Sequence, residues 1–134
     1  MIVGLGTDLV DVARFRRVAD RYGDHFLESL FSPAEIGWCR RRRRPWEHLA
    51  ARFAARVAVL KALGTGLVGG MSWKDIELVP GGGPGTCAME LRRQVREAAD
   101  RLGVRHVHVA MSVGRDVAAA TVVLEGRAAR SAGP

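Results

Sequence analysis

The segment that decides the fold is residues 47–63, EHLAARFAARVAVLKAL. Its large apolar residues recur at helical spacing and form a single stripe, which predicts a long helix packed against a core. The members of the stripe are Leu49, Phe53, Val57 and Leu60. Gly64 follows at the position where a left-handed residue commonly ends a helix. The sequence therefore predicts one dominant helix, around which the rest of the chain is arranged.

Shorter strand and helix patterns lie on both sides of this helix. Strands are predicted at residues 2–10, 74–79, 105–113 and 117–125, and the last two form a hairpin. Helices are predicted at residues 11–21, 25–31 and 87–102, and another begins at Ser32-Pro33-Ala34-Glu35 and ends before Pro45. This order predicts a single α+β domain at residues 1–125, with an antiparallel sheet packed on the long helix. Residues 126–134 lack periodicity and are expected to form a flexible tail.

The chain is strongly basic, with a formal net charge of +7, and it includes five consecutive arginines, Arg40–Arg44. A positive field attracts phosphates, nucleic acids or acidic proteins, but a charge run can also be a solvated surface. Aromatic residues make up only 6% of the chain, and no nucleic-acid-binding motif accompanies the arginines. We therefore expect no nucleic acid partner.

The cysteine pattern and the hydropathy pattern indicate where the protein works. Cys39 and Cys87 lie far apart and lack the spacing of zinc ligands, and two free thiols suit a reducing compartment. No segment approaches the roughly 18 apolar residues that suggest a membrane span, and no signal peptide is evident. We expect a cytoplasmic protein that has no membrane partner.

Four segments together resemble holo-acyl-carrier-protein synthase, the short form of the 4′-phosphopantetheinyl transferases. They are GLGTDLVDVARF at 4–15, ARFAARVAVLKALGTG at 51–66, SWKDIELV at 72–79 and HVAMSVGRDVAAATVVLE at 108–125. The resemblance implies a 4′-phosphopantetheinyl transferase-like fold and a homotrimer with clefts at the subunit interfaces. It also implies coenzyme A, Mg²⁺ and an acidic acyl carrier protein, whose serine accepts phosphopantetheine while 3′,5′-adenosine bisphosphate leaves.

The same resemblance assigns roles to particular residues. Asp8 matches the family's first metal carboxylate, although taken alone it would be interpreted as a cap of the next helix. Lys61 matches a lysine that contacts coenzyme A phosphate. It is followed by the intact loop Gly64, Thr65 and Gly66. Arg14 and Arg52 match basic positions that contact the carrier protein or the coenzyme, although isolated basic residues more often lie on a solvated face.

Two positions depart from the family pattern. Val57 stands where the family has a metal-binding glutamate, and Val113 stands where it has a catalytic histidine, after a retained Ser112. A hydrocarbon side chain can neither ligate Mg²⁺ nor transfer a proton. We therefore expect Mg²⁺ and coenzyme A binding to be weakened or lost, which leaves Asp8 and Ser112 as the catalytic candidates and Asp8 as the metal candidate. Asp11, Glu47 or Asp75 could replace the lost carboxylate.

Three functions follow from this mixture of retained and altered residues. The altered pair favours an enzyme recruited to secondary, polyketide-like metabolism, for example to cyclise or rearrange a small organic substrate in an apolar cleft. One alternative is a working phosphopantetheinyl transferase that tolerates the losses. The other is a non-catalytic protein that binds carrier protein or coenzyme A.

Overall fold

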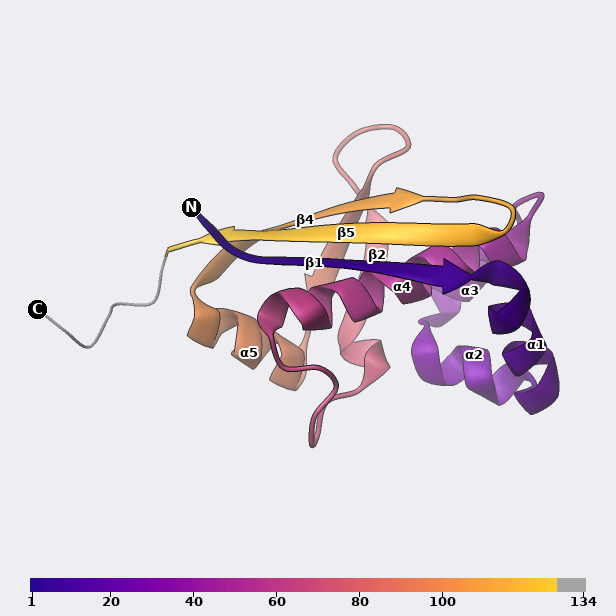
Figure 1. The fold of residues 1–134 in the computed structure, drawn as a ribbon, viewed down its shortest axis with the longest axis horizontal. Coiled ribbons are helices and arrows are strands. Elements are labelled where there is room, and N and C mark those ends of the chain that lie inside the picture. Colours follow the sequence, from indigo (N-terminus) through magenta and orange to yellow (C-terminus); the bar gives the residue numbers. More distant parts are fainter. Residues whose placement is uncertain (128–134) are drawn as a thin grey trace, which may run out of the picture.

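The structure is a computed structural model, and it describes residues 1–127 of the 134-residue chain. Along the chain run β1 (Ile2–Asp11), α1 (Val12–Tyr22), α2 (Asp24–Leu30), α3 (Pro33–Arg40), α4 (Pro45–Leu63), a 3₁₀ turn (Trp73–Asp75), β2 (Ile76–Pro80), β3 (Cys87–Leu91), α5 (Arg93–Leu102), β4 (Val104–Ser112) and β5 (Val117–Gly126). Figure 1 shows the long strands β1, β5 and β4 lying over α4. The expected α+β class, with antiparallel strands packed on one long helix, is confirmed.

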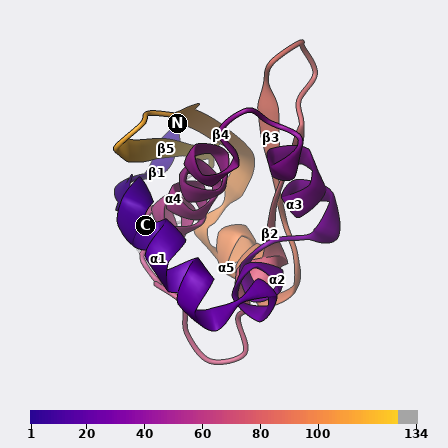
Figure 2. The same ribbon diagram turned by 90° about the vertical axis from the view of Figure 1, so that its right-hand side faces the viewer.

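One sheet has the strand order β1-β5-β4, and both of its pairings are antiparallel. Its inner face covers α4, and its outer face is open to solvent (Figures 1 and 2). The inner side chains of β5 are buried, and they are Ala118, Ala120, Val122 and Leu124. The outer face exposes large apolar side chains, among them Leu5 and Leu9 at 65% and 70%. The alternation along each strand thus separates a packed face from an outer face with exposed apolar side chains, which no part of residues 1–127 covers.

Two glycines let β1 lie directly against the backbone of α4. A Cβ added to Gly6 would lie only 2.0 Å from the carbonyl oxygen of Ala58, and one added to Gly4 would lie 2.4 Å from that of Ala62. No larger residue fits at either position without moving the strand. The glycines near the start of the chain therefore bring the next residues of β1, including Asp8, close to the helix.

A second sheet pairs β2 with β3, and α5 follows it. The predicted helix at residues 87–102 is wrong in its first third, because Cys87–Leu91 forms β3 and the helix begins at Arg93. Met89 is buried on one side of this strand, and its neighbours Ala88 and Glu90 are exposed. This alternation has the period of a strand, and the glycine-rich loop after Pro80 closes the hairpin.

The short helices pack around Phe15 and Phe31 against the N-terminal half of α4. The predicted capping box at the start of α3 is confirmed, because the Ser32 hydroxyl accepts from the Glu35 amide and the Glu35 side chain accepts from the Ser32 amide. Helix α3 ends at Arg40, so the rest of the arginine run lies in the turn before α4. None of the helices within residues 1–127 is long and apolar enough to cross a bilayer.

The expected boundary between domain and tail lies near the end of β5. This strand continues to Gly126, and the amide of Arg127 donates a hydrogen bond to the carbonyl oxygen of Gly103. The chain therefore stays attached to the domain through Arg127. The remainder of the predicted tail, residues 128–134, lies outside the described residues.

Candidate active site

Asp8 and Lys61, 53 residues apart in sequence, form an ion pair between β1 and α4. The ammonium nitrogen Nζ lies 3.1 Å from Asp8 Oδ1 and 3.0 Å from the carbonyl oxygen of Thr7. The Asp8 side chain is only 18% exposed, and that of Lys61 is 53% exposed. The pair therefore lies at the edge of the sheet, where Asp8 is shielded and the lysine still reaches solvent.

The glycine loop follows Lys61 directly. Gly64 ends α4 in the left-handed conformation, with φ 78°, and its amide donates to the carbonyl oxygens of Leu60 and Lys61. The Thr65 hydroxyl donates to the carbonyl oxygen of Gly66. The structure thus places the predicted loop residues beside Lys61. Their binding of coenzyme A stays a prediction.

Val57 lies one helical turn before Lys61, on the same side of α4. It is half-buried and belongs to neither apolar core cluster of the described residues. The expected continuous stripe is therefore wrong at this position, because Val57 faces the edge where Asp8 and Lys61 meet. A glutamate at this position would project toward the same edge.

The other candidate carboxylates are engaged elsewhere. Asp11, and not Asp8, caps α1, because its Oδ1 accepts from the Arg14 amide at 2.8 Å. Glu47 lies 3.6 Å from Arg44. Asp75 is buried in the capping box of the 3₁₀ turn. None of the three replaces the missing glutamate beside Asp8.

Ser112 and Asp8 are not brought together within one chain. Met111 and Asp8 both pair with Ala120, so β5 separates β4 from β1 at this level and the two backbones lie about 10 Å apart. Asp8 faces α4, whereas Ser112 lies on the outer face. The predicted catalytic pair could therefore act on one ligand only if another copy of the chain supplied one of its members.

Val113 lines a different pocket, with a cavity volume of about 790 Å³. Arg52 and His48 also line it. Burial and the neighbouring Arg42 lower the pKa of His48, which favours the neutral imidazole. The second apolar replacement, Val113, thus lies apart from Asp8 within the monomer.

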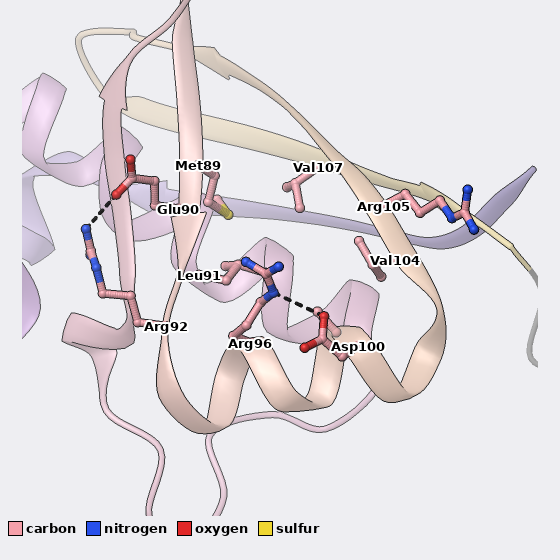
Figure 3. Close-up of a pocket in the computed structure, with 10 residues that line it drawn as sticks. Met89, Glu90, Leu91, Arg92, Arg96, Asp100, Val104, Arg105 and Val107 are labelled. Atoms are coloured by element: carbon pink, nitrogen blue, oxygen red, sulfur yellow. Dashed lines mark hydrogen bonds and ion pairs between the residues drawn. The ribbon is translucent and has the colours of Figure 1, made fainter.

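Another pocket, of about 460 Å³, lies between β3, α5 and β4 (Figure 3). Arg96 on its wall pairs with Asp100, and Arg92 pairs with Glu90. This pocket contains none of the predicted site residues. Two of its three arginines, Arg92 and Arg96, are therefore already paired with acids of the same wall.

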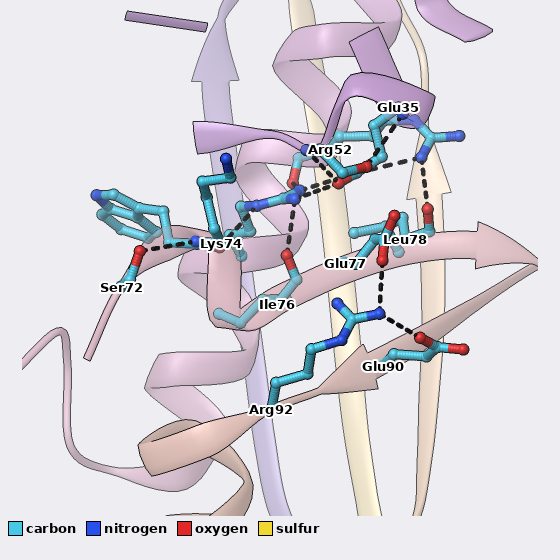
Figure 4. A network of polar contacts seen from close by, with 12 residues as sticks. Glu35, Arg52, Ser72, Lys74, Ile76, Glu77, Leu78, Glu90 and Arg92 are labelled. Carbon is cyan, nitrogen blue, oxygen red and sulfur yellow. Dashed lines mark hydrogen bonds and ion pairs between the residues drawn. The ribbon is translucent and has the colours of Figure 1, made fainter. Parts of the chain in front are cut away.

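Arg52 has an internal role that sequence analysis missed. Its guanidinium donates to Glu35 Oε2 at 3.4 Å and to the carbonyl oxygen of Leu78 at 3.1 Å (Figure 4). Only 6% of the side chain is exposed, and the guanidinium stacks over Trp38 at 4.7 Å. Binding of a coenzyme or carrier protein by Arg52 stays a prediction. Only the edge of the guanidinium that lines the pocket could take part in it.

Arg56, which sequence analysis did not single out, is the centre of this network. All five of its N–H donors are used, on both Glu35 oxygens and on the carbonyl oxygens of Trp73, Ile76 and Arg52. Burial lowers its pKa, and the hydrogen bonds to Glu35 oppose that change. The sequence of α4 alone does not indicate that Arg56 is buried, because its partner Glu35 belongs to α3.

Arg14 lies on the exposed side of α1, as the predicted contact with an acidic partner requires. The three other arginines of that helix, Arg16, Arg17 and Arg21, are exposed as well. The surface of α1 is therefore basic, and its role in partner binding stays a prediction.

Comparison with known proteins identifies the group to which this chain is related. The model of the 4′-phosphopantetheinyl transferase superfamily matches residues 4–122. The chain belongs to this superfamily. A holo-[acyl-carrier-protein] synthase of Koribacter versatilis is 41% identical over 127 residues, which cover 93% of this chain and 99% of the relative.

Solved structures of the superfamily have the same fold. The crystal structure of the Neisseria meningitidis holo-[acyl-carrier-protein] synthase matches with a TM-score of 0.82 and 31% identity, covering 93% of this chain and 99% of that one. The Helicobacter pylori synthase in complex with coenzyme A matches with a TM-score of 0.77 and 27% identity, covering 90% and 99%. The resemblance found in the sequence motifs is confirmed.

The donor set around Asp8 does not fit the Mg²⁺ ion that the superfamily implies. Within residues 1–127, no three His, Cys, Asp or Glu side chains are grouped to hold a metal. Asp8 is a single carboxylate, and Lys61 already neutralises it. Mg²⁺ requires octahedral oxygen coordination, to which this protein site offers few donors.

Proposed function

We propose that this chain transfers the 4′-phosphopantetheine group of coenzyme A to a serine of an acyl carrier protein. The observation that supports it best is the 41% identity with a holo-[acyl-carrier-protein] synthase over nearly the full length of both chains. In the reaction the serine oxygen bonds to phosphorus while the pyrophosphate P–O bond breaks. Phosphopantetheine stays on the serine, 3′,5′-adenosine bisphosphate leaves, and the serine proton passes to a base.

The retained residues suit the phosphate chemistry of this reaction. Lys61 supplies a fixed positive charge beside an exposed glycine loop, and phosphate groups are bound by such charges. Asp8 is the carboxylate closest to that charge, and it is the candidate for accepting the serine proton. An acidic carrier protein would dock on the basic surface around Arg14, and we place the reaction in the cytoplasm.

We further propose that the working form is a homotrimer whose clefts lie between subunits. The separation of Asp8 from Ser112 within one chain supports this, because in an assembly Asp8 on one copy could face Ser112 on the opposite edge strand of another copy. Exposed Leu5, Leu9 and Val117 on the outer sheet face offer an apolar contact surface. Light scattering on purified protein should give three times the chain mass. Leu9→Glu should release monomers that lack transfer activity, whereas a monomeric wild type that is active would contradict the proposal.

The proposed reaction is tested by mass spectrometry of apo carrier proteins incubated with the purified chain, coenzyme A and Mg²⁺. We expect the carrier mass to rise by one phosphopantetheine group. Asp8→Asn should reduce this rate strongly, and Lys74→Met, which changes the only other lysine, should leave it unchanged. Unmodified carriers from several fatty acid and polyketide systems would overturn the assignment.

A recruited role in polyketide-like metabolism has less support than transfer. Only the replacements Val57 and Val113 favour it, and they lie apart in the monomer. The carrier assay separates the two functions, because a recruited enzyme or a non-catalytic binding protein would leave the carrier serine unmodified.

A further inference from the structure

The environment of Lys61 Nζ resembles an oxygen site that an ammonium group has filled. The carboxylate of Asp8 and the carbonyl oxygen of Thr7 both lie within 3.1 Å of this nitrogen. These are the oxygen types that also ligate hard divalent cations. Since an ammonium group has three N–H donors and two are used here, one remains for a further acceptor.

Backbone packing fixes the position of this pair. Gly6 places β1 against the carbonyl oxygen of Ala58, only one turn from Lys61 along α4. The side chain of Asp8 emerges two residues later on the same face of the strand. Because β1 and α4 pack directly on each other, the backbone positions from which the two side chains meet are fixed.

Val57 removes the second carboxylate that a divalent cation would need at this edge. The half-buried valine contributes no donor, and the other candidate acids are engaged elsewhere. With one carboxylate and one ammonium group, the site is neutral before any ligand arrives. A resident divalent cation would add two positive charges that nothing in the protein balances.

We propose that Lys61 is the resident cation of the Asp8 site and that this chain binds its pyrophosphate-bearing ligand without a protein-held divalent cation. Asp8 and the Thr7 carbonyl hold the ammonium group, and the third N–H donates to a phosphate oxygen. The identity of that ligand as coenzyme A rests on the proposed function. The cation assignment itself rests on the pair and on Val57.

The first test measures Mn²⁺ binding to the full chain by electron paramagnetic resonance, with no ligand present. We expect Val57→Glu to bind one Mn²⁺ per chain more than about tenfold tighter than the wild type. In Val57→Gln the new side chain has nearly the same shape as the glutamate but carries no charge, so this variant should bind Mn²⁺ as weakly as the wild type. Unchanged circular dichroism would establish that each variant is folded. Stoichiometric Mn²⁺ binding by the wild type that Asp8→Asn abolishes would overturn the proposal.

The second test measures coenzyme A binding by calorimetry, once with EDTA and once with Mg²⁺. We expect similar affinities of the wild type in both buffers and a loss of about tenfold or more in Lys61→Met. Lys74→Met, with an exposed lysine elsewhere, serves as the matched control. Wild-type binding that EDTA abolishes would refute the cation assignment. Absence of binding in both buffers would instead overturn the proposed function, and the Mn²⁺ measurement would still decide on the cation.

Discussion

The buried pair of Glu35 and Arg56 gives the sharpest prediction about stability. Arg56 has no exposed surface, Glu35 is 2% exposed, and every N–H of the guanidinium has an acceptor. Replacing Glu35 by Gln keeps the shape of the side chain but removes the negative charge. The buried guanidinium then keeps its positive charge without a counter-ion. One amide oxygen replaces the two carboxylate oxygens, and the three backbone carbonyl oxygens still accept from the guanidinium.

Breaking a buried pair from one side typically costs about 3–5 kcal/mol, and the remaining amide oxygen places Glu35→Gln near 3 kcal/mol. Folded domains have a total stability of only about 5–15 kcal/mol. In a chain of 134 residues, the expected loss corresponds to a fall of about 10 °C in Tm. This variant should therefore remain folded at room temperature but with a much smaller margin.

Urea and thermal unfolding, followed by circular dichroism, measure this loss. Arg56→Met and the double variant complete a cycle, in which we expect the double variant to lose at least about 1 kcal/mol less than the two single losses combined. Asp100→Asn breaks the exposed pair with Arg96 and serves as the control, with an expected loss below about 0.5 kcal/mol. A loss below about 1 kcal/mol for Glu35→Gln would refute the reasoning.

Two further predictions concern the close packing of β1 and the buried thiol. Gly6→Ala should destabilise the fold by about 2–4 kcal/mol in urea unfolding, because its Cβ would collide with the backbone of Ala58. Gly37→Ala, whose Cβ would meet only a flexible side chain at 3.5 Å, should be neutral or stabilising; equal losses would contradict the packing argument. Burial raises the pKa of Cys39 to about 11, so Ellman's reagent should modify Cys87 first and Cys39 only after unfolding. The unfolded chain loses the Cys39 proton near the ordinary pKa of 9, whereas the folded chain keeps it until about pH 11. The free energy of unfolding should therefore fall between pH 9 and 11, and it should fall less in a Cys39→Ala variant.

Local patterns predicted most of the fold. The helix at residues 47–63 and the final hairpin depend on spacing within one segment, and the structure reproduces both within a few residues. Strand β3 was missed because Cys87–Leu91 runs directly into the apolar pattern of α5. The strand has its own pattern, in which Ala88 and Glu90 point outward on either side of an inward Met89. This alternation has the two-residue period of a strand and not the period of a helix.

The candidate site was predicted only as separate residues. Asp8 and Lys61 were each found through the family motifs, but their pairing depends on how close β1 comes to α4, which no spacing along the chain reports. Arg52 was predicted through the family motif to contact the carrier protein or the coenzyme, with a solvated face as the alternative, because most arginines are exposed. Its burial depends on Glu35, whose position beside α4 is a property of the folded chain.

Charge balance explains how a superfamily member could lose a metal-binding glutamate and still bind phosphate. With the lysine that the family motif also has, two carboxylates and a divalent cation carry one net positive charge, whereas Asp8 with Lys61 is neutral. An arriving pyrophosphate would therefore meet sites that differ by a single charge in the two arrangements. The geometry differs, because a divalent ion fixes several oxygens at once, whereas Lys61 has a single donor left. We therefore expect Val57 to lower the rate of transfer more than the affinity for coenzyme A, so that Val57→Glu with Mg²⁺ raises kcat and changes KM little. An unchanged kcat in a variant that binds Mn²⁺ would contradict this account of how the two cations differ.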